Sequence, residues 1–303
     1  MSCDDFQDGP NKYKISGRKY GKNEIRIFYV NKDGPCHIIK ELLINTRLTL
    51  ETNKEYISDD NTGIIDTKSQ RNSVYILAKK HGIKTTEDFG TLVCSYYLST
   101  YSHVKTASLY IEEENWERLS YDDETKGKLH NHAFMLTPKY VRTTVIVFNR
   151  GDEFPTISNG IKNLRIIKTT QNSFKNFSQN EHRSIADAEE RTLCLLLTFS
   201  WTYKQNPQID FCKTFNSILH VVLYNFAGDL EKGTMLTSVQ NTIFMAAKKI
   251  LDKVEEIEFV EVVCKNFHYD LFDFEIFKIP NEVNDVFYPQ ENPSEVHIRL
   301  DRK

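Results

Sequence analysis

The sequence predicts an α+β fold made of two tandem halves, each an antiparallel four-stranded sheet with two helices on one face. Two observations lead to this prediction. Several runs alternate between apolar and polar residues, which is typical of antiparallel strands with one covered face. Between these runs the apolar spacing becomes helical, and the order strand, strand, helix, helix, strand, strand occurs twice in 303 residues. Strands and helices in separate blocks indicate α+β rather than a doubly wound α/β fold.

The first half is assigned to residues 18–150, after a polar N-terminal tail at 1–17 that we expect to be flexible. Two alternating runs on either side of a Lys-Asp-Gly turn indicate a hairpin. Gly82 marks the end of the first helix, and Thr85 with Asp88 three residues later resembles a capping box. The expected elements are strands at 24–31 and 44–50, helices from about residue 67 and residue 85, and strands after residue 103 and at 141–148.

The second half is assigned to residues 151–303 and repeats the order. Its clearest strand is the alternating run at 193–203. The expected elements are strands at 157–168 and 193–203, helices over 211–226 and 239–254, and strands at 257–264 and 268–278. The open edges of such sheets need covering, so we expect the chain to form an oligomer by lateral joining of sheets.

Composition argues against several classes of protein. Lys plus Arg number 39 and Asp plus Glu 42, and a net charge of -3 disfavours broad electrostatic binding of nucleic acid or anionic lipid. No apolar run approaches the ~18 residues of a membrane span, and the polar N-terminus does not resemble a secretory signal. Six cysteines without a CxxC pair favour free thiols in a reducing compartment. We expect neither a nucleic-acid partner nor a membrane.

The sequence contains no familiar cofactor motif. Glycine-rich phosphate loops, a GxSxG turn and an HExxH motif are all missing. His130 and His132, in a His-Asn-His run, would share one face of a strand and leave a metal site open as an alternative. A metal needs at least three protein ligands, and no Cys or carboxylate lies at ligand spacing, which favours a structural hydrogen-bonding role. We therefore expect no metal and no cofactor.

Several segments together resemble the uricase (urate oxidase) family. They are LSTYSHV at 98–104, WER at 116–118, HNHAF at 130–134, LRIIKTTQ at 164–171, SVQ at 238–240, NFHY at 266–269 and VFYP at 286–289. Each string is weak alone, but together they follow the family order from about residue 18 to residue 300. The resemblance implies two tandem T-fold (tunnelling-fold) domains. It also implies a homotetramer whose sheets form a barrel, with active sites at subunit interfaces.

By the same resemblance the chain is expected to oxidise urate with dioxygen to 5-hydroxyisourate and hydrogen peroxide, using neither metal nor organic cofactor. Eukaryotic members of the family are usually peroxisomal and end in a Ser-Lys-Leu-type tripeptide. This sequence ends in Leu-Asp-Arg-Lys. Either it is truncated or it is not imported through that signal, so a cytoplasmic location is the alternative.

The resemblance also implies a set of substrate-binding residues. A planar guanidinium fork suits a carbonyl and an adjacent ring nitrogen of urate, and a carboxamide suits a neighbouring N–H and C=O edge. The corresponding residues are Arg191 and Gln240 for these two contacts, Phe174 for stacking on the purine, Val239 for a backbone N–H, and Ile185 for an apolar wall. The second apolar wall falls at Val296 or His297.

The catalytic residues implied by the resemblance are a Lys–Thr–His proton relay. Here the relay is Lys22, Thr67 and His268, with Asn266 and Thr67 holding dioxygen or water above the ring. A lysine acts as a base only where burial or a nearby charge lowers its pKa. Because the relay would be donated across the subunit interface, we expect a lone monomer to be inactive.

One departure from the family pattern concerns the relay. The family usually has Thr-Asp where this sequence has Thr67-Lys68. A cation at a helix N-terminus is unfavourable by roughly 0.3–1 kcal/mol, but the aspartate acts through its backbone N–H, which lysine also has. We expect an active enzyme with a shifted pH profile. The alternatives are a catalytically impaired purine-binding relative, a zinc-dependent pterin enzyme of the same fold, and a structural protein.

Overall fold

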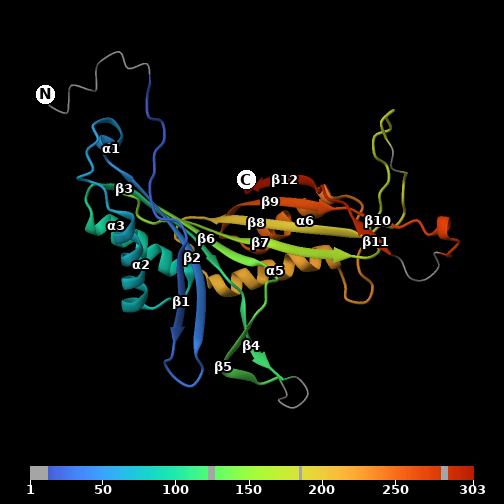
Figure 1. Cartoon of the computed structure of the whole chain (residues 1–303), viewed down its shortest axis with the longest axis horizontal. Helices are drawn as coiled ribbons and strands as arrows, with labels where there is room; N and C mark the ends of the chain where they lie inside the picture. The colour runs from blue at the N-terminus through green and yellow to red at the C-terminus, as the bar shows by residue number, and fades with distance from the viewer. Residues whose placement is uncertain (1–12, 122–126, 184–185, 281–285) are drawn as a thin grey trace.

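The chain forms one long antiparallel sheet with helices packed beside it (Figure 1). The structure is a computed structural model that describes residues 13–121, 127–183, 186–280 and 286–303. The sheet has eight strands in the order β1-β2-β3-β6-β7-β8-β9-β12. In the first half the elements are β1 (Ile25–Asn31), β2 (Ile38–Leu50), α1 (Lys54–Ile57), α2 (Thr67–His81), α3 (Thr86–Thr100), β3 (Val104–Glu113), β4 (Trp116–Ser120), β5 (Leu129–Leu136) and β6 (Val141–Asn149).

The second half repeats the four strands and two long helices. Its elements are β7 (Thr156–Lys168), β8 (Leu193–Tyr203), α5 (Phe211–Ala227), α6 (Val239–Lys253), β9 (Ile257–Phe267), β10 (Tyr269–Leu271), the short 3-10 helix η2 (Glu275–Phe277), β11 (Phe287–Pro289) and β12 (Ser294–Asp301). The predicted order strand, strand, helix, helix, strand, strand is therefore confirmed in both halves.

One face of the sheet is buried along its whole width. Across the middle of the sheet, Leu109 pairs with Ile146, which pairs with Ile157, and all three are buried. In the second half Phe199 and Trp201 continue the same face. Antiparallel partners project to the same side of a sheet, so this continuous apolar face is the one that the helices cover.

The helix boundaries follow the predicted signals. Thr85 is the N-cap of α3 and its side chain accepts from the Asp88 N–H. Ser238 caps α6 in the same way. Gly82 lies after α2 and Gly228 after α5, both with positive φ, a conformation that glycine adopts without strain.

The two halves correspond to each other in hydrogen bonding as well as in order. Arg150 donates to the carbonyls of residues 98, 101 and 104, at the end of α3 and the start of β3. Arg302 donates to those of residues 251, 254 and 257, at the equivalent places around α6 and β9. The backbone N–H groups of the two arginines bond to the carbonyls of residues 105 and 258. This repeat lets any position of one half be matched with a position of the other.

Three features differ from the sequence prediction. The two four-stranded sheets join edge to edge through β6 and β7 into one sheet. The last sheet strand is β12, not the predicted run at 268–278, because β10 within that run pairs only with β11 in a separate ribbon. The connection from β3 to β6 contains a hairpin of β4 and β5, which was not predicted and which projects away from the sheet (Figure 1).

Among the described residues, the two edge strands of the sheet, β1 and β12, each have a paired strand on one side only. In the described part of the chain, no helix combines the length and apolarity needed to cross a bilayer.

Candidate active site

A pocket of ≈ 160 Å³ lies at one end of the second half. The start of α6, the end of β9, the start of β12 and the loops at 172–177 and 191–192 form its walls. It brings together seven residues that the resemblance indicated, namely Phe174, Arg191, Val239, Gln240, Asn266, His268 and Val296.

The N-terminus of α6 contributes two of these groups. Ser238 caps the helix and accepts from the Asn241 N–H, and the first backbone bond of the helix runs from the Thr242 N–H to the Ser238 carbonyl, so the N–H groups of Val239 and Gln240 have no partner within the helix. Val239 is the first helical residue, and its N–H is one of these groups. The Gln240 carboxamide accepts from the Ser238 hydroxyl at 3.1 Å and is exposed. A helix N-terminus with free N–H groups favours an anionic ligand.

Phe174 and Arg191 come from two segments joined by backbone hydrogen bonds. Phe174 pairs with Ala188 in both directions, and the Arg191 N–H donates to the Asn172 carbonyl at 2.7 Å. The guanidinium of Arg191 lies 4.9 Å from the centre of the Phe174 ring. This cation–π contact holds the guanidinium at the pocket wall.

Phe177 also contacts the ring of Phe174, with the two centroids 4.2 Å apart and the planes 19° from parallel. A flat ligand that stacks on Phe174 therefore shares this ring with Phe177 or replaces it. The Ser173 hydroxyl, next to Phe174, is buried in the pocket wall and makes no hydrogen bond to another described residue. Buried polar atoms are almost always satisfied, so this hydroxyl is available to a water molecule or to a polar group of a ligand in the pocket.

His268 lies just beyond the end of β9 and faces the start of β12. Its Nε2 is 3.3 Å from the Ser294 hydroxyl, and Ser294 pairs with Asn266 in the sheet. Burial, and then the positive charge of Arg191, lower the pKa of His268, while Asp270 acts in the opposite direction. A lowered pKa keeps the imidazole neutral near pH 7, so that it can both accept and donate a proton.

The two candidates for the second apolar wall lie on opposite faces of β12. Val296 lines the pocket. The next side chain, His297, points to the other face of β12, and its Nε2 lies 2.8 Å from Glu261. The first wall, Ile185, lies outside the described residues.

Lys22, Thr67 and Lys68 lie elsewhere, at the first-half edge of the sheet. The Lys22 N–H donates to the Thr46 hydroxyl, which donates to Gln70, one turn into α2. Thr67 is the first residue of α2, next to Lys68, and Asp66 caps this helix. The structure thus places the three residues beside one another at the start of α2.

A single chain does not bring the proposed relay together. Lys22 lies beside β2 and Asn266 lies in β9, and five strand spacings of ~4.8 Å separate these strands, or roughly 24 Å. Figure 1 shows α2 at one end of the molecule and β10 at the other. His268 therefore shares the pocket with the substrate-binding residues, and Lys22 and Thr67 do not.

The two histidines of the His-Asn-His run lie on β5, with ring centres 4.6 Å apart. His37 is 5.8 Å from His132. Among the described residues no group of three or more His, Cys, Asp or Glu side chains could hold a metal ion. The Nδ1 atom of His130 instead accepts from the N–H groups of His132 and Ala133, in agreement with the structural role.

Sequence reasoning did not find Ser173, Phe177 or Ser294. The first two were close to the predicted Phe174, but nothing in the sequence shows which neighbours face the same cavity. Ser294 becomes visible only through the register of β9 and β12, which places it opposite Asn266.

Comparisons with known proteins identify the family of the chain. A family model described as Uricase matches residues 18–147 and 157–296. A uricase of Drosophila virilis is 35% identical, with 98% of this chain and 93% of the relative covered. A uricase of Danio rerio is 32% identical, with 91% and 90% covered.

Solved structures agree on the fold. The uricase from Arthrobacter globiformis has a TM-score of 0.86 at 24% identity, with 96% of each chain covered. A uricase from Bacillus fastidious has a TM-score of 0.76 at 20% identity, with 94% of each covered. The predicted fold class, α+β with two tandem T-fold domains, is confirmed.

Proposed function

The chain belongs to the uricase family, and on this premise we propose that it oxidises urate with dioxygen and water to 5-hydroxyisourate and hydrogen peroxide. We also propose that the reaction needs neither metal nor organic cofactor. The observation that carries the proposal is the second-half pocket, which is lined by the guanidinium of Arg191, the ring of Phe174 and the carboxamide of Gln240.

The pocket suits a flat purine anion. The Arg191 fork can donate two parallel hydrogen bonds to a carbonyl oxygen and the adjacent ring nitrogen. Gln240 offers one donor and one acceptor to a neighbouring N–H and C=O edge. The free N–H of Val239 and the unpaired hydroxyl of Ser173 supply further contacts, and the positive end of the α6 dipole favours the negative charge.

The chemistry removes two electrons and two protons from urate and delivers them to dioxygen as hydrogen peroxide, while water supplies the new hydroxyl group. Triplet dioxygen reacts slowly with closed-shell molecules, so the electron-rich urate dianion is the electron donor. The protein then contributes positioning and proton transfer. We assign proton transfer to Lys22, Thr67 and His268, and the holding of dioxygen or water to Asn266 and Thr67.

This relay requires a second copy of the chain, and the internal repeat supports a specific arrangement. A Cβ on Gly21 would collide with the Thr46 carbonyl, and one on Gly160 with the Phe199 carbonyl, so the segment at 17–22 is the first-half counterpart of the first part of β7, and β1 is the counterpart of the rest. By the same repeat, β12 is the counterpart of β6. The free edge of β12 is thus expected to pair with residues 17–22 of another copy, as β6 pairs with β7.

The register of this expected contact follows from β6 and β7. Arg142 pairs with Ile161 there, and their counterparts are Ser294 and Lys22. Lys22 of one copy then lies opposite Ser294 of another, whose hydroxyl is 3.3 Å from His268. Because Lys22 lies beside the start of α2, the same contact brings Thr67 of the first copy close to His268 of the second. We therefore propose a homotetramer with its sheets joined into a barrel and its active sites between subunits.

By family resemblance we propose a peroxisomal location, with the cytoplasm as the alternative. Fluorescence microscopy of the tagged full-length chain with a peroxisomal marker distinguishes the two.

The test of the function is a turnover assay. Loss of urate absorbance is followed together with hydrogen peroxide, before and after treatment with a chelator. Equal amounts of urate lost and peroxide formed, unchanged by the chelator, support the proposal. Thermal stabilisation by urate without turnover would identify the impaired purine-binding relative instead, and no response to urate would reject both.

A further inference from the structure

The first half contains a counterpart of the substrate pocket. Thr85 caps α3 as Ser238 caps α6, so Glu87 stands at the position of Gln240. The strand positions match as well, because Glu113 pairs with Arg142 between β3 and β6 as Asn266 pairs with Ser294 between β9 and β12. A cavity of ≈ 170 Å³ lies at this place, lined in part by Ile39, Glu113, Asn115, Arg142 and Phe215.

Four lining positions of this cavity coincide with lining positions of the substrate pocket under the repeat. They are Ile39 with Thr192, Glu113 with Asn266, Asn115 with His268, and Arg142 with Ser294. Phe215 and Asn216 of α5, the second-half counterpart of α2, add to the wall, and Glu114, Trp116 and Tyr140 complete it. The cavity between the two halves of one chain is thus built like the site expected between two copies.

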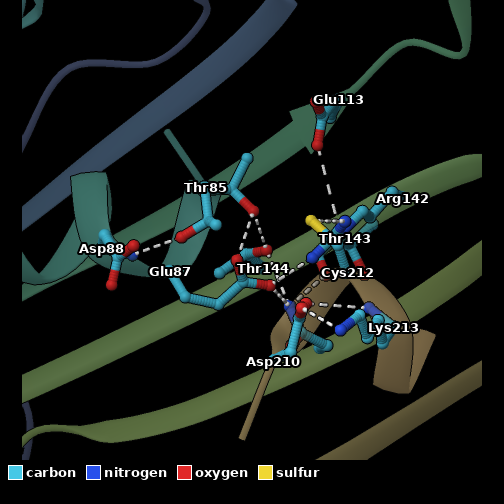
Figure 2. A network of polar contacts seen from close by, with 12 residues as sticks. Thr85, Glu87, Asp88, Glu113, Arg142, Thr143, Thr144, Asp210, Cys212 and Lys213 are labelled. Atoms are coloured by element: carbon cyan, nitrogen blue, oxygen red, sulfur yellow. Dashed lines mark hydrogen bonds and ion pairs between the residues drawn. The ribbon is translucent and has the colours of Figure 1, made fainter. Parts of the chain in front are cut away.

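The side chain of Arg142 reaches Glu87 at the N-terminal end of α3 (Figure 2), which by the repeat is the place of Gln240 in the substrate pocket. Its Nη2 donates to Glu87 at 2.6 Å, and its guanidinium lies 4.7 Å from the centre of the Phe215 ring. Glu87 is completely buried, and the Asn159 amide donates to the same carboxylate oxygen at 2.6 Å. The planar guanidinium of Arg142 is thus held at its edge by Glu87, near the N-terminus of α3, and on its face by the ring of Phe215.

Glu87 does not line the cavity itself but is contacted by Arg142, which does, and its carboxylate selects the partner at this helix end. An ionised carboxylate only accepts hydrogen bonds, so its partner must present N–H donors and a positive charge. Gln240 at the same position in α6 has both a donor and an acceptor, which suits an edge of urate. The two halves therefore offer the same scaffold to ligands of opposite charge.

We propose that the first-half pocket is a guanidinium-binding site whose ligand is the chain's own Arg142. This inference does not depend on the proposed function. Once emptied, the site is expected to accept small guanidinium or amidine cations.

The test replaces Arg142 with the residue found at its counterpart position, Arg142→Ser. Removal of the guanidinium leaves Glu87 buried without its cation, which lowers the melting temperature. Low millimolar guanidinium chloride is then titrated. The expected result is a saturable rise of roughly 3 °C in melting temperature for Arg142→Ser, because an ion that binds only the folded state stabilises it. The wild-type chain should show no rise.

Two control variants separate this effect from general ion binding. Lys248→Ser removes the cation of an exposed ion pair of the same 2.6 Å length, and guanidinium should not raise its melting temperature. Glu87→Gln combined with Arg142→Ser removes both buried charges and should fold without responding to guanidinium. Sodium chloride at equal ionic strength replaces guanidinium in a parallel titration.

A folded Arg142→Ser chain whose melting temperature does not rise with guanidinium would overturn the proposal. If this variant does not fold alone, refolding yield is compared with and without guanidinium, where recovery supports the proposal and its failure contradicts it.

Discussion

The expected division of the active site between two chains can be tested by mixing two inactive variants. Lys22→Met removes a relay group on the first-half side, and Arg191→Gln removes the guanidinium fork on the second-half side. Two charge-assisted hydrogen bonds contribute about 3 kcal/mol or more, so Arg191→Gln should lower kcat/KM at least about a hundredfold.

Random pairing of the two variants restores activity in a predictable fraction of sites. Half of the pairs contain one chain of each kind, and in such a pair one site has both native residues while the other has neither. About a quarter of all sites should therefore regain full function. A site formed within one chain would give no recovery at all, since every chain lacks one of the two residues.

The assay measures urate loss after the two chains are co-expressed with different tags. Mixed oligomers are first verified by purification on both tags in succession. A mixture of one variant with Lys248→Ser serves as a control for the assembly. Mixed oligomers without recovered turnover, or substantial turnover by the Lys22→Met chain alone, would refute the reasoning.

Further predictions concern individual groups. The pKa of His268 is lower in the folded chain than its ordinary value of 6.5. Between these two values the unfolded chain binds more protons at this group than the folded chain does. The free energy of unfolding should therefore fall as the pH falls through this window. Arg191→Gln removes one cause and should raise this pKa in an NMR titration; an unchanged value would contradict the assignment. Arg302→Ala deletes three hydrogen bonds at the end of α6 and should cost about 2–4 kcal/mol in urea denaturation, and a cost below about 0.5 kcal/mol would show that solvent replaces them. Phe174→Leu removes the stacking ring and should raise KM for urate about 3–10-fold with little change in kcat, whereas an equal KM would exclude stacking on this ring. Lys68→Asp should shift the pH profile of turnover, and an identical profile would mean that the lysine acts only through its backbone.

Local signals in the sequence were sufficient for most of the fold. The alternation from Leu193 to Tyr203 predicted β8 with its bounds, because one face of this strand meets the helices and period two is then unavoidable. Thr85 and Gly82 marked helix ends because capping depends on neighbouring residues alone. The hairpin of β4 and β5 was missed because its residues are largely exposed, so burial does not impose a pattern on them.

Long-range register was the part that local signals could not provide. The run at 268–278 was predicted as the last strand because it follows β9 at once, but β12 takes the place beside β9. Which chain segment pairs with an edge depends on loop geometry, not on the pattern of either strand. For the same reason Ser294 was not recognised as a neighbour of His268, and the resemblance alone could not separate Val296 from His297.

The repeat explains why the second half leaves its helix end open to a ligand, whereas the first half fills the same place with its own side chain. Both pockets lie at the start of a helix and at the end of two paired strands, so the scaffold does not distinguish them. Two side chains do. In the first half the long side chain of Arg142 spans the gap to Glu87, and the buried ion pair joins β6 to α3 at the junction of the halves. In the second half Ser294 is too short to reach Gln240, so the cavity stays open at an edge that a second copy can cover. The internal repeat therefore accounts for three features together. They are the exposed edge of β12, the open substrate pocket beside it, and the position of Lys22 and Thr67 at the far end of the sheet, away from His268.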